Sequence, residues 1–278
     1  MKVISFVNMK GGVGKTTLAL NVAHCLSATH GKRVAVIDID PQFNLTQCMF
    51  SGEEYVGLLK SGVDTVVNLF DDEPKPIASS VAGASVKSPK TMSDIGMQKK
   101  KGLNLLPGNI DLYRIEMSPG EGREFALKRF VDERLEGNFD YVIIDTPPTP
   151  SIWMSSALIA SQYYLIPVKP DPLSLIGIDL LKSIIDRKKK NFGLNIACAG
   201  VVFTLVERPD SIPYYQGREN LLKSDFWKSY LYDNYLPKRT GFARTQIEQP
   251  FILHYDDFDL RESLKGVVNE LLEELGDD

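Results

Sequence analysis

Short apolar runs that alternate with helical patterns constrain the fold of this 278-residue chain more than any other feature. The runs are rich in Val and Ile and lack polar alternation, which is typical of strands buried on both faces of a parallel sheet. Strands are expected at 2–7 (KVISFV), 33–38 (RVAVID), 103–108 (LNLLPG), 140–145 (DYVIID), 163–168 (YYLIPV) and 196–204 (IACAGVVFT), and helices at 15–28, 121–136, 151–161, 173–190 and 213–230. Parallel strands joined by helices require right-handed crossovers. The sequence therefore predicts an α/β fold with a doubly wound, mostly parallel sheet and helices on both faces.

This pattern runs through residues 1–278 without an internal repeat, which indicates one domain. Residues 71–101 are rich in Ser, Pro, Lys and Gly and have weak periodicity, so we interpret them as a long insertion-like excursion from that domain. Ligands of doubly wound folds bind at the carboxyl ends of the strands. The segments NMKGG, DIDPQ and DTPP follow predicted strands, and we expect the binding site among them.

Charge and cysteine content narrow the function further. A formal net charge of −4 and a pI near 5.5 exclude a general polyanion binder, so any contact with nucleic acid must come from a local basic patch. No apolar run approaches the roughly 20 residues that cross a bilayer. Cys25, Cys48 and Cys198 form no metal-binding spacing and suit a reducing compartment. These features predict a cytoplasmic protein.

A glycine-rich turn, KGGVGKTT, separates the first predicted strand from the first predicted helix. Glycines allow backbone N–H groups to converge on an anion, and the helix N-terminus adds partial positive charge. Lys15 is placed to reach the β- and γ-phosphates of a nucleotide, and the Thr16 hydroxyl to ligate Mg²⁺. A plain strand-to-helix turn is the alternative. The nucleotide-binding residues expected in this turn are Lys10, Gly11, Gly12, Val13, Gly14, Lys15, Thr16 and Thr17.

The same glycines allow a second interpretation, a dinucleotide-binding fold and an NAD-dependent oxidoreductase. Residues 12–14 have the G-x-G spacing, and Asp38 ends the next strand where a ribose-binding acid would stand. However, Thr17 occupies the position of the third glycine, and a dinucleotide gives no reason for a lysine on each side of the turn. A triphosphate with Mg²⁺ is therefore the favoured ligand.

The turn departs from the standard phosphate-binding loop, whose pattern G-x-x-x-x-G-K-[ST] requires glycine at position 9. The chain has Met9 there, followed by Lys10. In this respect the turn resembles the deviant Walker A loop of the ParA/MinD family of P-loop NTPases, and the ParA (Soj)-like partition ATPases within it. The resemblance implies that Lys10 contacts the nucleotide phosphate of a second subunit in an ATP-sandwich homodimer, while Lys15 serves the nucleotide of its own chain.

Aspartates end two of the predicted strands. Asp145 ends YVIID, which has the form of a Walker B strand and favours a role in the Mg²⁺ shell. Asp38 and Asp40 belong to DIDPQFN, which resembles the first switch segment of ParA proteins and implies that Asp40 positions the attacking water. The alternative for each aspartate is a helix N-cap or a turn. The expected metal ligands are Thr16, Asp40 and Asp145, and the expected catalytic side chains are Lys10, Lys15 and Asp40.

The resemblance covers nearly the whole chain outside residues 71–101. Family segments match GLNLLPGNIDL, DYVIIDTPP, LIPVKPDPLSLIGIDLL and GVVFT in order, and YLPKRTGFARTQIEQPFILHYD aligns without gaps. The resemblance implies that Thr204 and Pro237 lie beside the adenine.

Family members couple ATP-driven dimerisation to a surface, which is DNA for ParA-like proteins and membrane for MinD-like proteins. The chain ends in EELGDD, and acidic residues are repelled by anionic lipid, so membrane binding is disfavoured. Lys238, Arg239 and Arg244 fall where ParA-like proteins carry DNA-contacting arginines, although only Lys238 occupies a basic family position. Arg208 follows the strand that ends near 205. These four residues are the expected DNA contacts, and such a patch binds phosphates without reading bases.

The sequence thus predicts an Mg²⁺-dependent ATPase that acts as a molecular switch in plasmid or chromosome partition or in cargo positioning. Its ATP-bound homodimer would bind nonspecific DNA and associate with the nucleoid, and a ParB-like or other adaptor protein would stimulate hydrolysis. The alternative is an ATPase switch that acts on a protein partner without DNA, as in MinD-like positioning.

Overall fold

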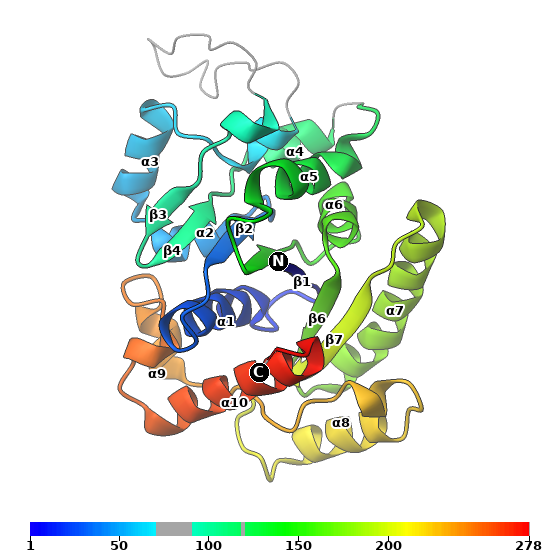
Figure 1. Ribbon diagram of the computed structural model, residues 1–278. Coiled ribbons are helices and arrows are strands. Elements are labelled where there is room, and N and C mark those ends of the chain that lie inside the picture. The colour runs from blue at the N-terminus through cyan, green and yellow to red at the C-terminus, as the bar shows by residue number, and fades with distance from the viewer. Residues whose placement is uncertain (71–90, 118–119, 278) are drawn as a thin grey trace.

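Seven strands form one sheet in the computed structural model, which describes residues 1–70, 91–117 and 120–277, with the backbone alone for 172–176 (Figure 1). The strands are β1 (Lys2–Phe6), β2 (Val34–Asp38), β3 (Gln98–Lys100), β4 (Leu103–Leu106), β5 (Tyr141–Asp145), β6 (Tyr163–Val168) and β7 (Ala197–Phe203). Their order across the sheet is β3-β4-β2-β5-β1-β6-β7. β3 is antiparallel to β4, and every other pair of neighbours is parallel. The predicted mostly parallel sheet is confirmed.

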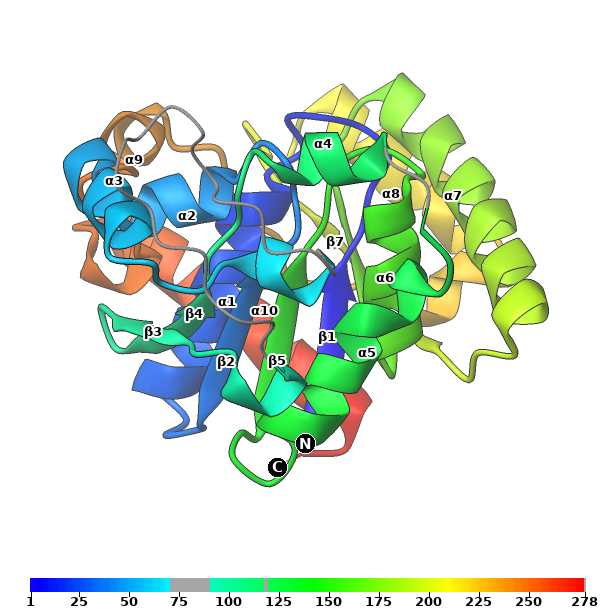
Figure 2. The same ribbon diagram turned by 90° about the horizontal axis from the view of Figure 1, so that it is seen from above.

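Helices cover both faces of the sheet, as predicted. α1 and α10 pack on one face, and α5 and α6 pack on the other (Figure 1). Figure 2 shows the same molecule from above, with α3 and β3 toward one edge of the sheet and α7 toward the other. The helices are α1 (Lys15–Ala28), α2 (Asn44–Met49), α3 (Gly52–Lys60), α4 (Leu112–Glu116), α5 (Ala126–Phe130), α6 (Ile152–Ala160), α7 (Pro172–Phe192), α8 (Ile212–Leu222), α9 (Thr240–Thr245) and α10 (Phe258–Leu275).

Alternate strand residues enter two different cores. In β2, Val34 and Val36 pack in the cluster under α1 and α10, while Ala35 and Ile37 pack in the cluster under α5 and α6. All five residues of the strand are buried. Because successive side chains of a strand point to opposite faces, burial on both faces explains why the run contains no polar alternation.

Two predicted helices differ from the structure. The helix expected at 121–136 is divided into a 3-10 turn (Arg123–Phe125), α5 and a π-helical turn (Val131–Leu135) that the Glu136 N–H closes onto the carbonyl of Val131 at 3.1 Å. The helix expected at 213–230 ends at Leu222. Beyond it the indole of Trp227 is buried and donates a 2.7 Å hydrogen bond to Asp179 of α7, so tertiary packing turns the chain there.

The excursion predicted at 71–101 divides into two parts. Residues 71–90 lie outside the described residues. Residues 91–101 contain a 3-10 turn at Met92–Asp94 and strand β3, which pairs with β4 at the edge of the sheet. An ion pair of 2.5 Å between Lys100 and Glu54 joins this edge strand to α3.

The sheet order brings three strand ends together. β5 lies between β1 and β2, with Asp145 in register with Phe6 on one side and with Asp38 on the other. The loops that follow these strands therefore meet at one carboxyl edge, as the sequence predicts. Within the described part of the chain, no helix combines the length and apolar character that a membrane span needs.

Candidate functional site at the carboxyl edge of the sheet

The loop between β1 and α1 has the backbone that a phosphate cradle requires. Gly12 and Gly14 adopt left-handed φ angles of +71° and +76°, which other residues rarely adopt. A Cβ atom on Gly11 or Gly12 would meet no heavy atom within 4 Å, whereas one on Gly14 would lie 3.6 Å from the side chains of Thr204 and Leu205. The loop is thus open on the side of its first two glycines and supported at its last one.

Lys15 and Thr16 converge on the carboxylate of Asp145. Lys15 Nζ lies 2.8 Å from Asp145 Oδ1 and also donates to the carbonyl of Thr146, and the Thr16 hydroxyl donates to Asp145 Oδ2 at 2.6 Å. Asp145 is fully buried and Lys15 nearly so. A buried ion pair is stable only when its remaining polar atoms are satisfied, and here hydrogen bonds satisfy them. The three side chains form one preassembled group.

Asp40 stands beside this group on the loop after β2. Asp40 is 4% exposed, and its Oδ1 accepts a 2.9 Å hydrogen bond from the N–H of Gln42. Burial raises the pKa of Asp40, while the positive charge of Lys15 and the bond from Gln42 oppose that rise. The carboxylate therefore lies in a water-poor environment close to a lysine.

Asp38 does not reach the site, because it anchors the loop that carries Asp40. Its Oδ2 accepts hydrogen bonds from the N–H and the hydroxyl of Thr46 at 2.9 and 2.7 Å, and the Thr46 hydroxyl oxygen accepts one of 2.8 Å from the Gly108 N–H. Burial, followed by the charge of Asp145, raises the pKa of Asp38. A ribose-binding role for Asp38, which the dinucleotide interpretation requires, has no support in this arrangement.

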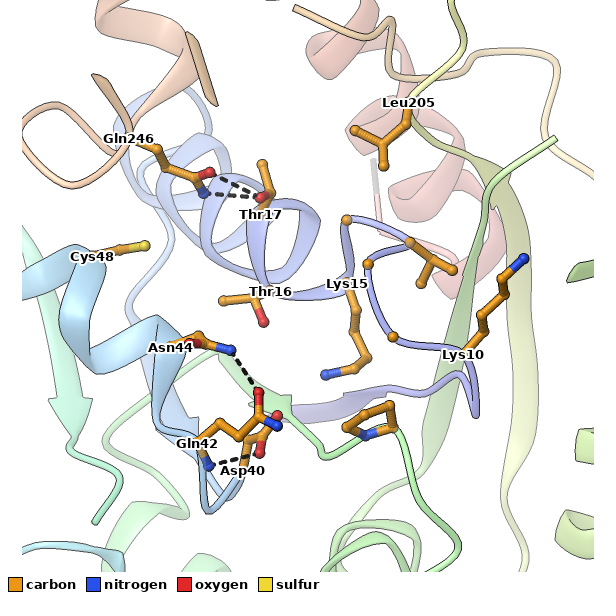
Figure 3. A pocket seen from close by; sticks show the side chains of 15 residues that line it. Lys10, Lys15, Thr16, Thr17, Asp40, Gln42, Asn44, Cys48, Leu205 and Gln246 are labelled. Carbon is orange, nitrogen blue, oxygen red and sulfur yellow. Dashed lines mark hydrogen bonds between the residues drawn. The ribbon is translucent and has the colours of Figure 1, made fainter. Parts of the chain in front are cut away.

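A pocket of about 340 Å³ opens between these elements. Figure 3 shows the ends of Lys15, Thr16 and Asp40 gathered on one side of the loop. Residues of the pocket that were not predicted are Gln42, Asn44, Cys48, Pro148, Leu205 and Gln246. Burial raises the pKa of the Cys48 thiol to about 11, so this side chain forms a neutral part of the wall.

Gln246 reaches the pocket from the segment that follows α9. Its Nε2 donates a 2.9 Å hydrogen bond to the Thr17 hydroxyl in the first turn of α1 (Figure 3). The two residues lie 229 positions apart in the sequence, so no local motif links them. The only signal in the sequence was that Gln246 falls in the long segment that aligns with the family.

Lys10 points away from the converging group. Its Nζ lies 2.6 Å from Asp171 Oδ1 of its own chain, and Figure 3 shows it extending to the side opposite Lys15. The Lys10 N–H donates a 2.8 Å hydrogen bond to Asn8 Oδ1. The two lysines that flank the turn therefore have different carboxylate partners.

Thr204 and Pro237 are not among the residues that line the pocket. The Thr204 hydroxyl donates a 2.5 Å hydrogen bond to the carbonyl of Val13, and Pro237 pairs with Val206 in a short bridge. Leu205, between these two segments, lines the pocket with a φ of +54°. The adenine contacts of Thr204 and Pro237 stay predictions.

Three of the four predicted DNA contacts have acidic neighbours. Lys238 pairs with Glu207 at 2.6 Å, Arg239 with Asp257 at 2.5 Å, and Arg208 lies 3.9 Å from Asp210. Arg244, on α9, is exposed. The basic patch is therefore partly neutralised by carboxylates of its own chain.

The donors of the site fit a triphosphate with Mg²⁺. The described residues contain no group of three or more His, Cys, Asp or Glu side chains arranged to hold a metal alone. Mg²⁺ is usually held by one or two carboxylates together with phosphate oxygens and water. A hydroxyl (Thr16) and two carboxylates (Asp40 and Asp145) beside an open glycine cradle match that requirement. A strand, glycine loop and helix with strand-end carboxylates define a P-loop nucleotide-binding protein.

Comparison with known proteins identifies the family. The family model described as AAA domain matches residues 1–198. The chain is 30% identical over 257 residues to the sporulation initiation inhibitor protein Soj of Bacillus subtilis, covering 92% of this chain and 91% of Soj. It is 26% identical over 259 residues to the chromosome partitioning protein ParA of Caulobacter vibrioides, covering 92% and 88%. The chain belongs to the family that this model describes, and its likeness to Soj places it in the ParA/MinD family of P-loop ATPases.

A solved structure has the same fold. It is that of a plasmid partition protein from Borrelia burgdorferi bound to AMPPNP, which superimposes with a TM-score of 0.71 at 21% identity and covers 98% of both chains. That protein was crystallised with an ATP analogue, which agrees with the nucleotide predicted from the glycine-rich turn.

Proposed function

We propose that this protein is an ATP- and Mg²⁺-dependent switch that hydrolyses ATP and alternates between a single chain and a homodimer that binds nonspecific DNA. The observation that carries the proposal is the group formed by Lys15, Thr16 and Asp145, set beside Asp40 at the mouth of an open glycine cradle. Phosphoryl transfer depends mainly on positioning and charge stabilisation, and this group supplies both.

Each residue of the group has a defined role. The backbone of residues 11–14 and Lys15 bind the phosphates, and Thr16 and Asp145 hold Mg²⁺, which neutralises charge on the phosphates when bound. Asp40 orients the attacking water. At 4% exposure this carboxylate lies in an environment from which most other water is excluded.

The proposed dimer rests on Lys10. The Lys10 side chain is 37% exposed and extends away from Lys15, and a residue that reaches a second nucleotide must lie at the surface in this way. The membership in the ParA/MinD family, with relatives named for partition and sporulation control, supports this role.

DNA is the proposed surface, with contacts at Arg208, Lys238, Arg239 and Arg244. An adaptor protein of the ParB type is proposed to stimulate hydrolysis and release the DNA. The protein would then be cytoplasmic and associated with the nucleoid while it holds ATP.

A second function is favoured by one observation. Lys238 and Arg239 are already paired with Glu207 and Asp257, which reduces the positive charge available to DNA phosphates. A switch that binds a protein partner without DNA would need no such charge.

The activity is tested by Asp40→Asn. This variant keeps the size of the side chain, so we expect it to bind ATP–Mg²⁺ with nearly wild-type affinity and to lose hydrolysis by 100-fold or more, on the order of other losses of positioning groups. The measurements are nucleotide binding by calorimetry and phosphate release.

The matched control is Asp225→Asn, because Asp225 is 99% exposed and lies outside the pocket. It should hydrolyse ATP at the wild-type rate. Turnover by Asp40→Asn at the rate of this control would contradict the role of Asp40.

A further inference from the structure

Lys10 is held by its own chain from two sides. Its amine pairs with Asp171 Oδ1 at 2.6 Å, and its N–H is bound by Asn8, whose own Nδ2 donates a 2.7 Å hydrogen bond to the carbonyl of Pro167 in β6. Asp171 stands in the short connection between β6 and α7. The lysine is thus fixed against the end of β6, away from Lys15 (Figure 3).

The ion pair is placed where it can be exchanged for another. The side chains of Lys10 and Asp171 are 37% and 24% exposed, so water screens their attraction and the pair contributes modestly to stability. A carboxylate offers the same kind of charged oxygen as a nucleotide phosphate. Because both side chains are partly exposed, separating the pair costs little.

We propose that Asp171 is a positioning residue that holds Lys10 within its own chain and competes with the contact of Lys10 to the phosphate of a second copy. The inference rests on the proposed function, because it requires an ATP-dependent dimer in which Lys10 crosses the interface. In this arrangement Asp171 sets the concentration at which dimers form. Each dimer must break two Lys10–Asp171 pairs.

The size of the effect follows from the exposure of the pair. Removing two partly exposed ion pairs of ordinary strength, one from each chain, should tighten the dimer about 2- to 30-fold. Asp171→Asn removes the charge and keeps the shape, so this variant should dimerise at correspondingly lower concentration.

The test is sedimentation equilibrium of full-length wild type and Asp171→Asn with Mg²⁺ and AMPPNP, which excludes differences in hydrolysis. The matched control is Asp186→Asn, which removes the 2.6 Å ion pair with Lys182 on α7 and the same unit of charge. We expect tighter dimers for Asp171→Asn only. A dimer constant for Asp171→Asn that equals that of the control, or is weaker than wild type, would overturn the inference.

A second measurement separates this role from a general structural one. In the single chain without nucleotide, the rate at which an amine-reactive reagent modifies Lys10, followed by mass spectrometry, should rise severalfold in Asp171→Asn. Modification of Lys182 should stay unchanged in that variant and rise in Asp186→Asn. An unchanged rate at Lys10 would show that Asp171 does not hold it and would overturn the inference.

The two levels of the proposal fail in different ways. If wild type binds AMPPNP yet stays monomeric, the proposed dimer fails and the inference fails with it. If wild type dimerises and Asp171→Asn does so equally, the proposed function stands and only the role of Asp171 is lost.

Discussion

Gly108 has no room for a side chain beside the loop that carries Asp40. A Cβ atom there would lie 2.7 Å from Phe43 Cβ and 2.9 Å from the carboxyl carbon of Asp38, and both neighbours belong to the strand and loop that carry Asp40. We expect Gly108→Ala to lower the free energy of unfolding by about 1–3 kcal/mol, the usual cost of overpacking a dense region. Hydrolysis should fall as well, because the loop must shift. Urea unfolding and phosphate release measure the two effects.

The control for this variant is Gly57→Ala. Gly57 lies in α3 with nothing within 4 Å of an added Cβ, so alanine should leave stability unchanged or raise it by up to about 1 kcal/mol. Equal stability of the two variants would contradict the close contact at Gly108.

Single residues also show how far the sequence alone reaches. Lys15, Thr16 and Asp145 were predicted because the loop and the strand end each carry a local motif, and the structure brings the three within hydrogen-bonding distance. Gln246 was not predicted, because its contact with Thr17 joins segments 229 residues apart. Likewise, no spacing rule connects Lys10 with Asp171, since the pairing of β1 with β6 in the sheet brings them together.

At the scale of elements, one face of α1 holds the segment that follows α9. Asn21 is fully buried, and its side chain accepts from the Ile252 N–H at 2.6 Å and donates to the carbonyl of Pro250 at 3.2 Å. We expect Asn21→Ala to destabilise the protein by about 2–5 kcal/mol, because it leaves two buried backbone groups without partners.

The comparison for Asn21→Ala is Asn138→Ala. Asn138 is exposed and donates one 3.0 Å hydrogen bond to the carbonyl of Arg134, so its loss should cost no more than about 0.5 kcal/mol. Chemical denaturation of both variants measures the difference. A cost for Asn21→Ala as small as that for Asn138→Ala would show that α1 does not hold this segment.

His24 on α1 makes the stability of the protein depend on pH. His24 is stacked on Phe251 with ring centroids 3.7 Å apart, and burial, followed by the charge of His254, lowers the pKa of His24 to about 4. In the unfolded chain His24 takes up a proton near its ordinary pKa of 6.5, whereas in the folded protein it does so only near pH 4. Neutral His24 therefore makes its full contribution to the free energy of unfolding above about pH 6.5, and this contribution is lost as the pH falls from about 6.5 toward 4.

His24→Phe keeps an aromatic ring and removes the titration. We expect the free energy of unfolding of wild type to fall more steeply than that of His24→Phe between pH 7 and 4.5, as measured by urea unfolding at several pH values. Parallel curves for the two proteins would contradict the lowered pKa of His24.

Two of the elements that the sequence did not predict share a physical cause. The strand β3 has three residues with no apolar periodicity and is stabilised by pairing with β4, and the π-helical turn after α5 depends on how that helix packs against α6. Tertiary contacts decide both, whereas the long buried strands and α1 follow from local patterns that the sequence displays.

For the whole molecule, the charge of the proposed DNA surface is the quantity to vary. The combined change of Lys238, Arg239 and Arg244 to Gln should weaken retention on nonspecific duplex DNA and reduce the slope of log K against log salt by about 0.9 for each lost phosphate contact. Dimerisation with AMPPNP should persist, because none of the three lies among the residues that line the pocket.

A variant with Lys188, Lys189 and Lys190 changed to Gln removes the same charge from the end of α7 and should retain DNA binding. Equal losses in the two triple variants would show that net charge, rather than this patch, governs retention.

The central claim is that ATP bound in this pocket switches the protein to a DNA-binding dimer. The most direct measurement is retention of wild type on nonspecific duplex DNA with ATP–Mg²⁺, with ADP and without nucleotide, at two salt concentrations. The account predicts salt-sensitive retention with ATP–Mg²⁺ alone. Equal retention in all three states, or none in any of them, would contradict it, and absence in all three would leave an ATPase whose output is a protein partner.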